Sequence, residues 1–108
     1  MKILLCCSGG LSTTMLMDSM KKTVHNSQKL KDEDFTFKAI PTDLLETEVD
    51  DTDVLVLGPQ VAHRLDAITP IINPKKIPYV IIDQETYGSM DGATALKMAL
   101  VAYKKAQQ

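Results

Sequence analysis

The chain has 108 residues, of which 44% are hydrophobic and 24% charged, with a formal net charge of −2. This length suits one ordinary domain covering residues 1–108, and the charge balance gives no reason to expect a nucleic acid or an anionic lipid surface as partner. No apolar run approaches the roughly 18 residues of a membrane span and none suits a signal peptide, so we expect a soluble cytoplasmic protein.

Four short segments are predicted to be β-strands. Near-continuous aliphatic runs of this length are typical of parallel strands that are covered on both faces. One segment instead alternates apolar and polar residues, as an edge strand would, and Pro41 is expected to end it. In chain order the four segments are 2–7, 35–40, 53–58 and 79–83, the second being the alternating one.

Between these runs the apolar residues recur at helical spacing. A helix is predicted after the glycine turn, a short one over 42–49, a third after Gly58-Pro59 and a fourth at the C-terminus. The alternation of strand and helix predicts a doubly wound parallel sheet with right-handed crossovers. The residues that mark the first, third and fourth helices are Leu16, Met20 and Val24; Val61, Leu65, Ile68 and Ile72; and Leu96, Leu100 and Tyr103.

The first turn of such a sheet, at the carboxyl end of a strand, is the usual place for a ligand. Here it reads "CCSGGLSTT", residues 6–14. Gly9 and Gly10 permit positive φ, and successive N–H groups leading into a helix form a concavity that binds anions. The hydroxyls of Ser12, Thr13 and Thr14 are candidates to cap the helix and to add donors.

Of the two cysteines, Cys7 is the candidate nucleophile. It is the last residue of the predicted strand, where a helix N-terminus and amide donors would lower its pKa below the roughly 8.5 of a free thiol. Attack by its thiolate on phosphorus would place a phosphoryl group under the same donors. Cys6 belongs to the aliphatic run and is interpreted as a buried hydrophobe. Adjacent cysteines form no disulfide framework, which indicates a reducing compartment.

This loop is similar to that of low-molecular-weight tyrosine phosphatases and arsenate reductases, in which the cysteine is followed by five residues and then an arginine. That arginine stabilises charge in the transition state. The equivalent residue here is Thr13, and the only arginine of the chain is Arg64. A site without the guanidinium should hold a thiophosphate but hydrolyse it poorly. We therefore expect a phosphatase-like fold, a four-stranded parallel sheet in the order 2-1-3-4 with helices on both faces, that acts as a carrier.

Three motifs together resemble the IIB component of the lactose/chitobiose/cellobiose class of the bacterial sugar phosphotransferase system. The resemblance implies that Cys7 accepts a phosphoryl group from a phosphohistidine of the IIA protein and passes it to a sugar bound by the membrane component IIC. It also implies that the phosphate lies in a loop of Ser8, Gly9, Gly10, Leu11, Ser12, Thr13 and Thr14, where Leu11 replaces the usual Met. No cofactor or metal is implied. The motifs are "CCSGGLSTT", "LGPQVAHRL" (57–65) and "DQETYGSMDGATAL" (83–96).

Other residues and other functions remain open at this level. Gln60, Asp83 and Tyr87 are further site candidates, although helix capping explains Asp83 and Asp91, and packing explains Tyr87, equally well or better. His25 and His63 are interpreted as surface residues. Most methionines should fill the core, with one or two near the loop forming an adaptable docking surface. The alternatives are a cysteine phosphatase and a non-catalytic module, either a regulator or a flavin binder, although the chain has no Trp and only 3 Tyr and 2 Phe to stack a flavin ring.

Overall fold

The computed structural model of the chain describes residues 1–7 and 10–107, and the side chains of these residues except at 10–12. Its centre is a parallel sheet in the order β2-β1-β3-β4, which confirms the predicted topology. Pro41 is the last residue of the edge strand rather than the residue that follows it. The strands are β1 (Lys2–Cys7), β2 (Thr36–Pro41), β3 (Val54–Leu57) and β4 (Tyr79–Ile81).

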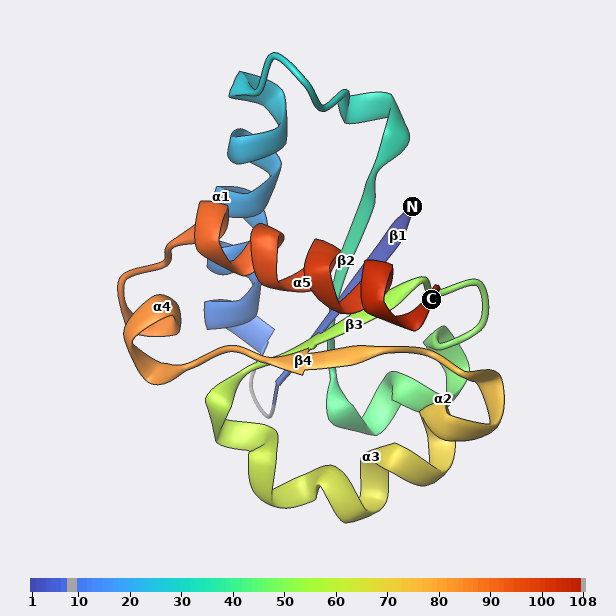
Figure 1. The fold of residues 1–108 in the computed structure, drawn as a ribbon. Coiled ribbons are helices and arrows are strands. Elements are labelled where there is room, and N and C mark those ends of the chain that lie inside the picture. The colour runs from blue at the N-terminus through green and yellow to red at the C-terminus, as the bar shows by residue number, and fades with distance from the viewer. Residues whose placement is uncertain (8–9, 108) are drawn as a thin grey trace.

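The sheet is covered on both faces, as the aliphatic strands predicted. Figure 1 shows α1 (Gly10–Asn26) and α5 (Gly92–Ala106) on one face, and α2 (Leu45–Glu48) and α3 (Leu65–Ile72) on the other. Each face has its own apolar core, and β1 contributes to both because successive side chains of a strand point in opposite directions. Among the described residues, the structure contains no helix that is both long and apolar enough to cross a bilayer.

The prediction of one continuous helix after Gly58-Pro59 is wrong in its first half. Residues Pro59–Arg64 form a 3-10 helix, and α3 begins only at Leu65. Val61 is the single buried residue of the 3-10 segment, and its N–H is bonded to the carbonyl of Gly58. One buried residue cannot distinguish a 3-10 turn from an α-turn, and this is why the apolar spacing failed there.

Helix α4 (Gln84–Gly88), which was not predicted from the sequence, follows β4. A short turn then leads into α5. A Cβ added to Gly92 would overlap the backbone of Ser19 in α1. Ser19 Oγ accepts a hydrogen bond from the Gly92 N–H at 3.0 Å and donates one to the Met90 carbonyl at 2.8 Å. The Asp-Gly pair of the third motif therefore joins α5 to α1, with Asp91 capping α5.

Candidate functional site

The two neighbouring cysteines occupy different environments at the end of the central strand. Cys6 is fully buried and lies with Leu4 in the core between the sheet and α3. Cys7 is the last residue of β1 and borders the same core, and its Sγ lies 3.1 Å from Oγ1 of Thr13 in α1. The contact with Thr13 directs the Cys7 thiol toward the start of α1.

Cys6 is held as a neutral thiol. Burial, followed by the nearby Cys7 and Asp43, raises its pKa to about 12. Both effects disfavour the thiolate, because a negative charge loses hydration on burial and is repelled by other negative groups. A thiol that stays protonated at neutral pH is a poor nucleophile, which agrees with its interpretation as a buried hydrophobe.

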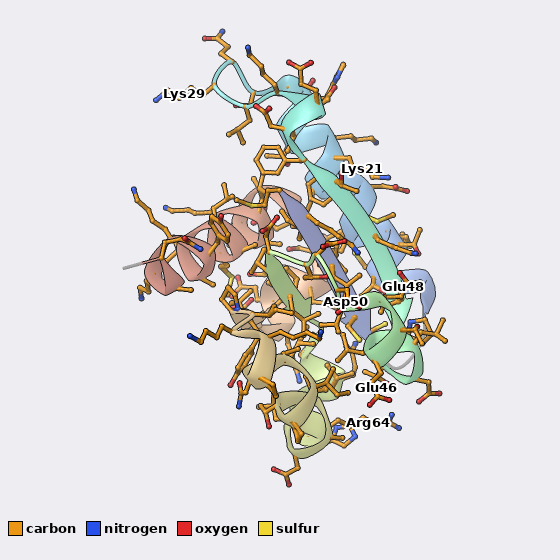
Figure 2. All side chains as sticks on the ribbon, turned by 90° about the vertical axis from the view of Figure 1, so that its right-hand side faces the viewer. Lys21, Lys29, Glu46, Glu48, Asp50 and Arg64 are labelled. Atoms are coloured by element: carbon orange, nitrogen blue, oxygen red, sulfur yellow. The ribbon has the colours of Figure 1, made fainter. Side chains whose placement is uncertain are left out.

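At the position where the phosphatases have an arginine, a buried hydroxyl contacts the sulfur. Thr13 is 1% exposed and Cys7 is 2% exposed, so their contact is shielded from bulk water. The only arginine of the sequence, Arg64, lies in the 3-10 segment, exposed at the molecular surface (Figure 2), where its Nη1 donates a hydrogen bond to Oγ1 of Thr42 at 3.1 Å. The described side chains therefore place a neutral hydroxyl beside the sulfur.

Gly58 brings two of the three further candidates close to Cys7. It directly follows β3, the neighbour of β1, and a Cβ at this position would lie 3.4 Å from Cys7 Cβ and 3.4 Å from Tyr87 Cε1. The same Cβ would lie 2.8 Å from Oε1 of Gln60, so a larger residue here would displace the Gln60 amide. In the sequence, Gly58 is recognisable only as part of the motif "LGPQVAHRL".

A recess of about 270 Å³ opens beside this group. It is lined by the side chains of Gln60 and Tyr87 and by Gln84, a residue that the sequence analysis did not single out. Tyr87 is 6% exposed and forms part of the core under α5, so it packs and lines the recess at once. Gln84 belongs to the unpredicted α4, and no pattern in the sequence placed that helix at the site.

Asp83 acts as a helix cap. Its carboxylate accepts a hydrogen bond from the N–H of Thr86 at 2.9 Å, at the start of α4, and bonding to Thr86 holds its pKa below the ordinary value. A carboxylate held ionised is in the opposite state from the one that a general acid needs. Asp91 caps α5 in the same way, through Thr94.

The remaining predicted loop residues are only partly described. Ser8 and Gly9 lie outside the described residues, as do the side chains of Leu11 and Ser12. Helix α1 already begins at Gly10, so Thr13 and Thr14 lie inside it, and the expectation that they cap it is wrong.

Methionines and histidines lie largely as expected. Met20 is buried and Met17 partly buried, whereas Met15 is 53% exposed near the start of α1. His25 and His63 are exposed, and His25 Nδ1 lies 2.8 Å from Oδ2 of Asp32. Met15 is therefore the methionine of α1 that is available to a partner.

Comparison with known proteins agrees with this geometry over almost the whole chain. The sequence model of the family "PTS system, Lactose/Cellobiose specific IIB subunit" matches residues 2–98. The chain is 29% identical over 99 residues to the oligo-beta-mannoside-specific EIIB component of Bacillus subtilis (strain 168), covering 92% of each chain. It is 32% identical over 100 residues to the galactose-specific EIIB component of Lactococcus lactis subsp. cremoris (strain MG1363), covering 90% of this chain and 91% of the relative.

Among solved structures, a cellobiose-specific IIB component from Borrelia burgdorferi superposes with a TM-score of 0.78 at 35% sequence identity. The superposition covers 98% of this chain and 94% of the other. Sequence and structure thus agree on the same family, with the strand-end cysteine and its helix in place. The chain belongs to the lactose/cellobiose-specific IIB subunits of the phosphotransferase system.

Proposed function

We propose that this chain is a cytoplasmic phosphocarrier, one IIB domain over residues 1–108, that carries a phosphoryl group on Cys7. IIB components in general are phosphotransferases that work with IIA and IIC partners. In the first step, an S–P bond forms at Cys7 while the N–P bond of a phosphohistidine on IIA breaks. In the second, a sugar hydroxyl oxygen bonds to the phosphorus as the S–P bond breaks, the hydroxyl proton is released, and the thiolate returns.

The contact between Cys7 and Thr13 carries this proposal. It directs the sulfur to the start of α1, where a phosphoryl group on it would meet the amide groups of a helix N-terminus. Phosphoryl transfer requires positioning and charge stabilisation more than it requires covalent chemistry, and backbone donors supply both. We assign the phosphate oxygens to the loop of Ser8, Gly9, Gly10, Leu11, Ser12, Thr13 and Thr14.

The hydroxyl of Thr13 explains why a carrier is favoured over a phosphatase. A guanidinium offers two parallel donors and a full charge to the transition state of hydrolysis, whereas a hydroxyl offers one neutral donor. The guanidinium of Arg64 instead donates a hydrogen bond to Oγ1 of Thr42. A phosphocysteine here should therefore persist long enough to meet a second protein.

The sugar substrate is proposed as a β-linked disaccharide of the cellobiose, chitobiose or lactose type, bound by the membrane component IIC. The family name and the Borrelia burgdorferi structure refer to cellobiose or lactose, whereas two relatives are named for oligo-beta-mannoside and for galactose. Gln60, Tyr87 and Cys7 all lie around Gly58. Gln60 and Tyr87 are proposed to line the path by which a donor or acceptor reaches the phosphorus. Asp83 is proposed only to hold α4 in place beside them.

The test is phosphorylation followed by mass mapping. The protein is incubated with phosphoenolpyruvate, the general phosphotransferase proteins and a matching IIA, and its intact mass should rise by one phosphoryl group that maps to Cys7. Cys7→Ser should abolish the gain, and the matched control Cys6→Ser, which changes the neighbouring thiol, should keep it. A phosphoryl group that remains in Cys7→Ser would overturn the proposal.

A second measurement separates the carrier from a phosphatase. Wild-type protein is assayed for turnover of an aryl phosphate, and we expect none above background. Multiple turnovers that disappear in Cys7→Ser would show a phosphatase in place of a carrier. Transfer of the label from phosphorylated protein to β-linked disaccharides, in membranes that contain IIC, completes the assignment.

A further inference from the structure

Strand β4 leaves one edge of the sheet open. It pairs with β3 on one side only, and in the sheet order of the described chain it has no neighbour on the other. The carbonyl of Pro78 and the N–H of Ile82 bond to β3, at Leu55 and Leu57, each at 2.9 Å. Because alternate residues of a parallel strand direct their backbone groups to opposite sides, those of Tyr79 and Ile81 point to the open edge.

An apolar groove runs beside this edge, between β4 and α5. It has a volume of about 640 Å³, and α5 contributes residues at helical spacing, including Met98, Val101 and Lys105. Tyr79 on the strand is 38% exposed and Val101 on the helix is 44% exposed, although both are large hydrophobic residues. Exposed apolar side chains gathered at one groove are typical of an interaction site.

The charges at this groove are of one sign. Lys97 and Lys105 line it, and no carboxylate does. Helix α5 has three lysines and no acidic residue, although the net charge of the whole chain is −2. In the described part of the chain, neither Lys97 nor Lys105 forms an ion pair. By contrast, Nζ of Lys75, shortly before β4, lies 2.6 Å from Oδ1 of Asp50.

We propose that the groove between β4 and α5 binds an extended, acidic segment of a partner protein, which adds to the sheet as a further strand beside β4. Its main chain would bond to the outward N–H and C=O groups of Tyr79 and Ile81. Of its side chains that point toward α5, a central apolar one would enter the groove against Val101, with acidic ones on either side of it. Its carboxylates would meet Lys97 and Lys105. The open backbone edge favours a peptide over a membrane surface, which has no strand to add.

This site is separate from the phosphoryl chemistry. Cys7 lies at the carboxyl end of β1, whereas the groove includes Ile77 and Pro78, which precede β4 at the amino end of the sheet. A bound segment would therefore leave the end of the sheet that carries Cys7 accessible. The proposal does not depend on the assignment of Cys7, and its test requires no phosphorylation.

The test uses two synthetic peptides of about six residues, the usual length of a strand. Both have Thr at every second position, and the positions between them, which share one face of a strand, are Glu, Val and Glu in one peptide and Lys, Val and Lys in the other. We expect the acidic peptide alone to bind, with amide shifts in NMR spectra concentrated at Tyr79, Ile81 and α5. The double variant Lys97→Glu/Lys105→Glu should weaken binding at least about tenfold, because two attractive contacts become repulsive. The control Lys21→Glu/Lys22→Glu makes the same charge change on the exposed side of α1 (Figure 2) and should not alter binding.

A second pair of variants tests the strand edge itself. Tyr79→Pro removes the outward N–H while leaving the bonds between β3 and β4 intact, and Tyr79→Ala removes only the ring. We expect the proline variant to lose more affinity than the alanine variant. Equal binding of the two peptides, or shifts confined to another surface, would overturn the proposal. So would binding to anionic vesicles that depends on Lys97 and Lys105 while Tyr79→Pro has no effect, because that pattern assigns the face to a membrane.

Discussion

The contact between Cys7 and Thr13 is the point at which one side chain distinguishes this site from that of a related phosphatase. Both side chains are almost fully buried, and the hydroxyl and the sulfur are 3.1 Å apart. A thiolate or a thiophosphate formed there would receive a hydrogen bond from this neutral hydroxyl. Buried hydrogen bonds to charged groups are among the stronger ones, so removing this hydroxyl should be measurable.

Thr13→Val replaces that hydroxyl by a methyl group of similar size. We expect phosphorylation by IIA to slow about 10- to 100-fold, since a hydrogen bond to a charged group contributes about 1.5–3 kcal/mol. The rate is read from the intact mass at successive times. Thr23→Val is the matched control, because it removes a hydroxyl of the same helix that bonds to the Ser19 carbonyl, away from Cys7. Equal rates for Thr13→Val and wild type would show that the hydroxyl has no part in transfer.

At the scale of the elements, the junction between α1 and α5 depends on one glycine. The Gly92 Cα lies against the backbone of Ser19, and both neighbouring hydrogen bonds pass through the Ser19 hydroxyl. Because backbone atoms cannot rotate away as a side chain can, a methyl group at this position would force the two helices apart.

Gly92→Ala should therefore lower the free energy of unfolding by about 2–3 kcal/mol, in the upper part of the range for overpacked sites. Urea denaturation measures the change. Gly88→Ala is the matched control, because a Cβ there meets nothing within 4 Å and the residue has an ordinary negative φ. We expect it to change stability by less than about 0.5 kcal/mol. Similar losses of stability in both variants would show that the close approach of Gly92 to Ser19 is not what makes the glycine necessary.

The carboxylates that cap α4 and α5 make the stability of the fold depend on pH. Hydrogen bonds at Thr86 and Thr94 hold the pKa values of Asp83 and Asp91 below 3.8, the ordinary value for an aspartate. A group with a lowered pKa in the folded state contributes stability that is present above its unfolded pKa and is lost as the pH falls through the folded pKa. These contributions should therefore decline below about pH 3.8.

Asp83→Asn/Asp91→Asn keeps two good capping residues but removes both titrating groups. We expect the double variant to lose less stability than wild type as the pH falls below about 3.8, where the carboxylates begin to take up protons. Thermal unfolding in a series of buffers gives the comparison. Parallel pH curves for the two proteins would show that other groups govern acid unfolding.

At the scale of the whole molecule, the sheet carries one apolar core on each face. Ile82 lies in the core under α1 and α5, and Ile72, the last residue of α3, lies in the core on the other face. Both side chains are fully buried. Packing on the two faces should therefore contribute independently to stability, while β1 and β3, which have side chains on both faces, make unfolding cooperative.

Ile72→Val and Ile82→Val should each cost about 0.5–1.5 kcal/mol, and the double variant should cost their sum to within about 0.5 kcal/mol. Urea denaturation of wild type, the two single variants and the double variant gives a double-mutant cycle. Each of the four proteins should unfold in a single transition. A coupling energy clearly above that margin would mean that the two cores are not independent.

Most of the fold could be predicted from local sequence. Aliphatic runs of strand length identified three of the strands, alternation identified the edge strand β2, and the order of the sheet followed from the resemblance to known proteins. The short helix α4 was missed, and Pro59–Arg64 was misassigned, because segments this short contain too few buried residues to establish a period.

The site could be predicted in part. The choice of Cys7 over Cys6 required only the end of an aliphatic run followed by two glycines, and the environments of the two thiols agree with it. The positions of Gln60 and Tyr87 beside Cys7 were not predictable from spacing, since Gly58, which brings them together, comes from another strand.

The sequence by itself determined the strands, the parallel alternation and the residue that ends β1, because hydrophobic periodicity and glycine conformation act within a few neighbouring residues. Only the tertiary structure decided that Gly92 lies against Ser19, that Tyr87 lies beside Cys7, and that an apolar groove remains between β4 and α5. Those contacts join residues far apart in the chain, and they depend on how the strands are registered and how the helices pack on the sheet.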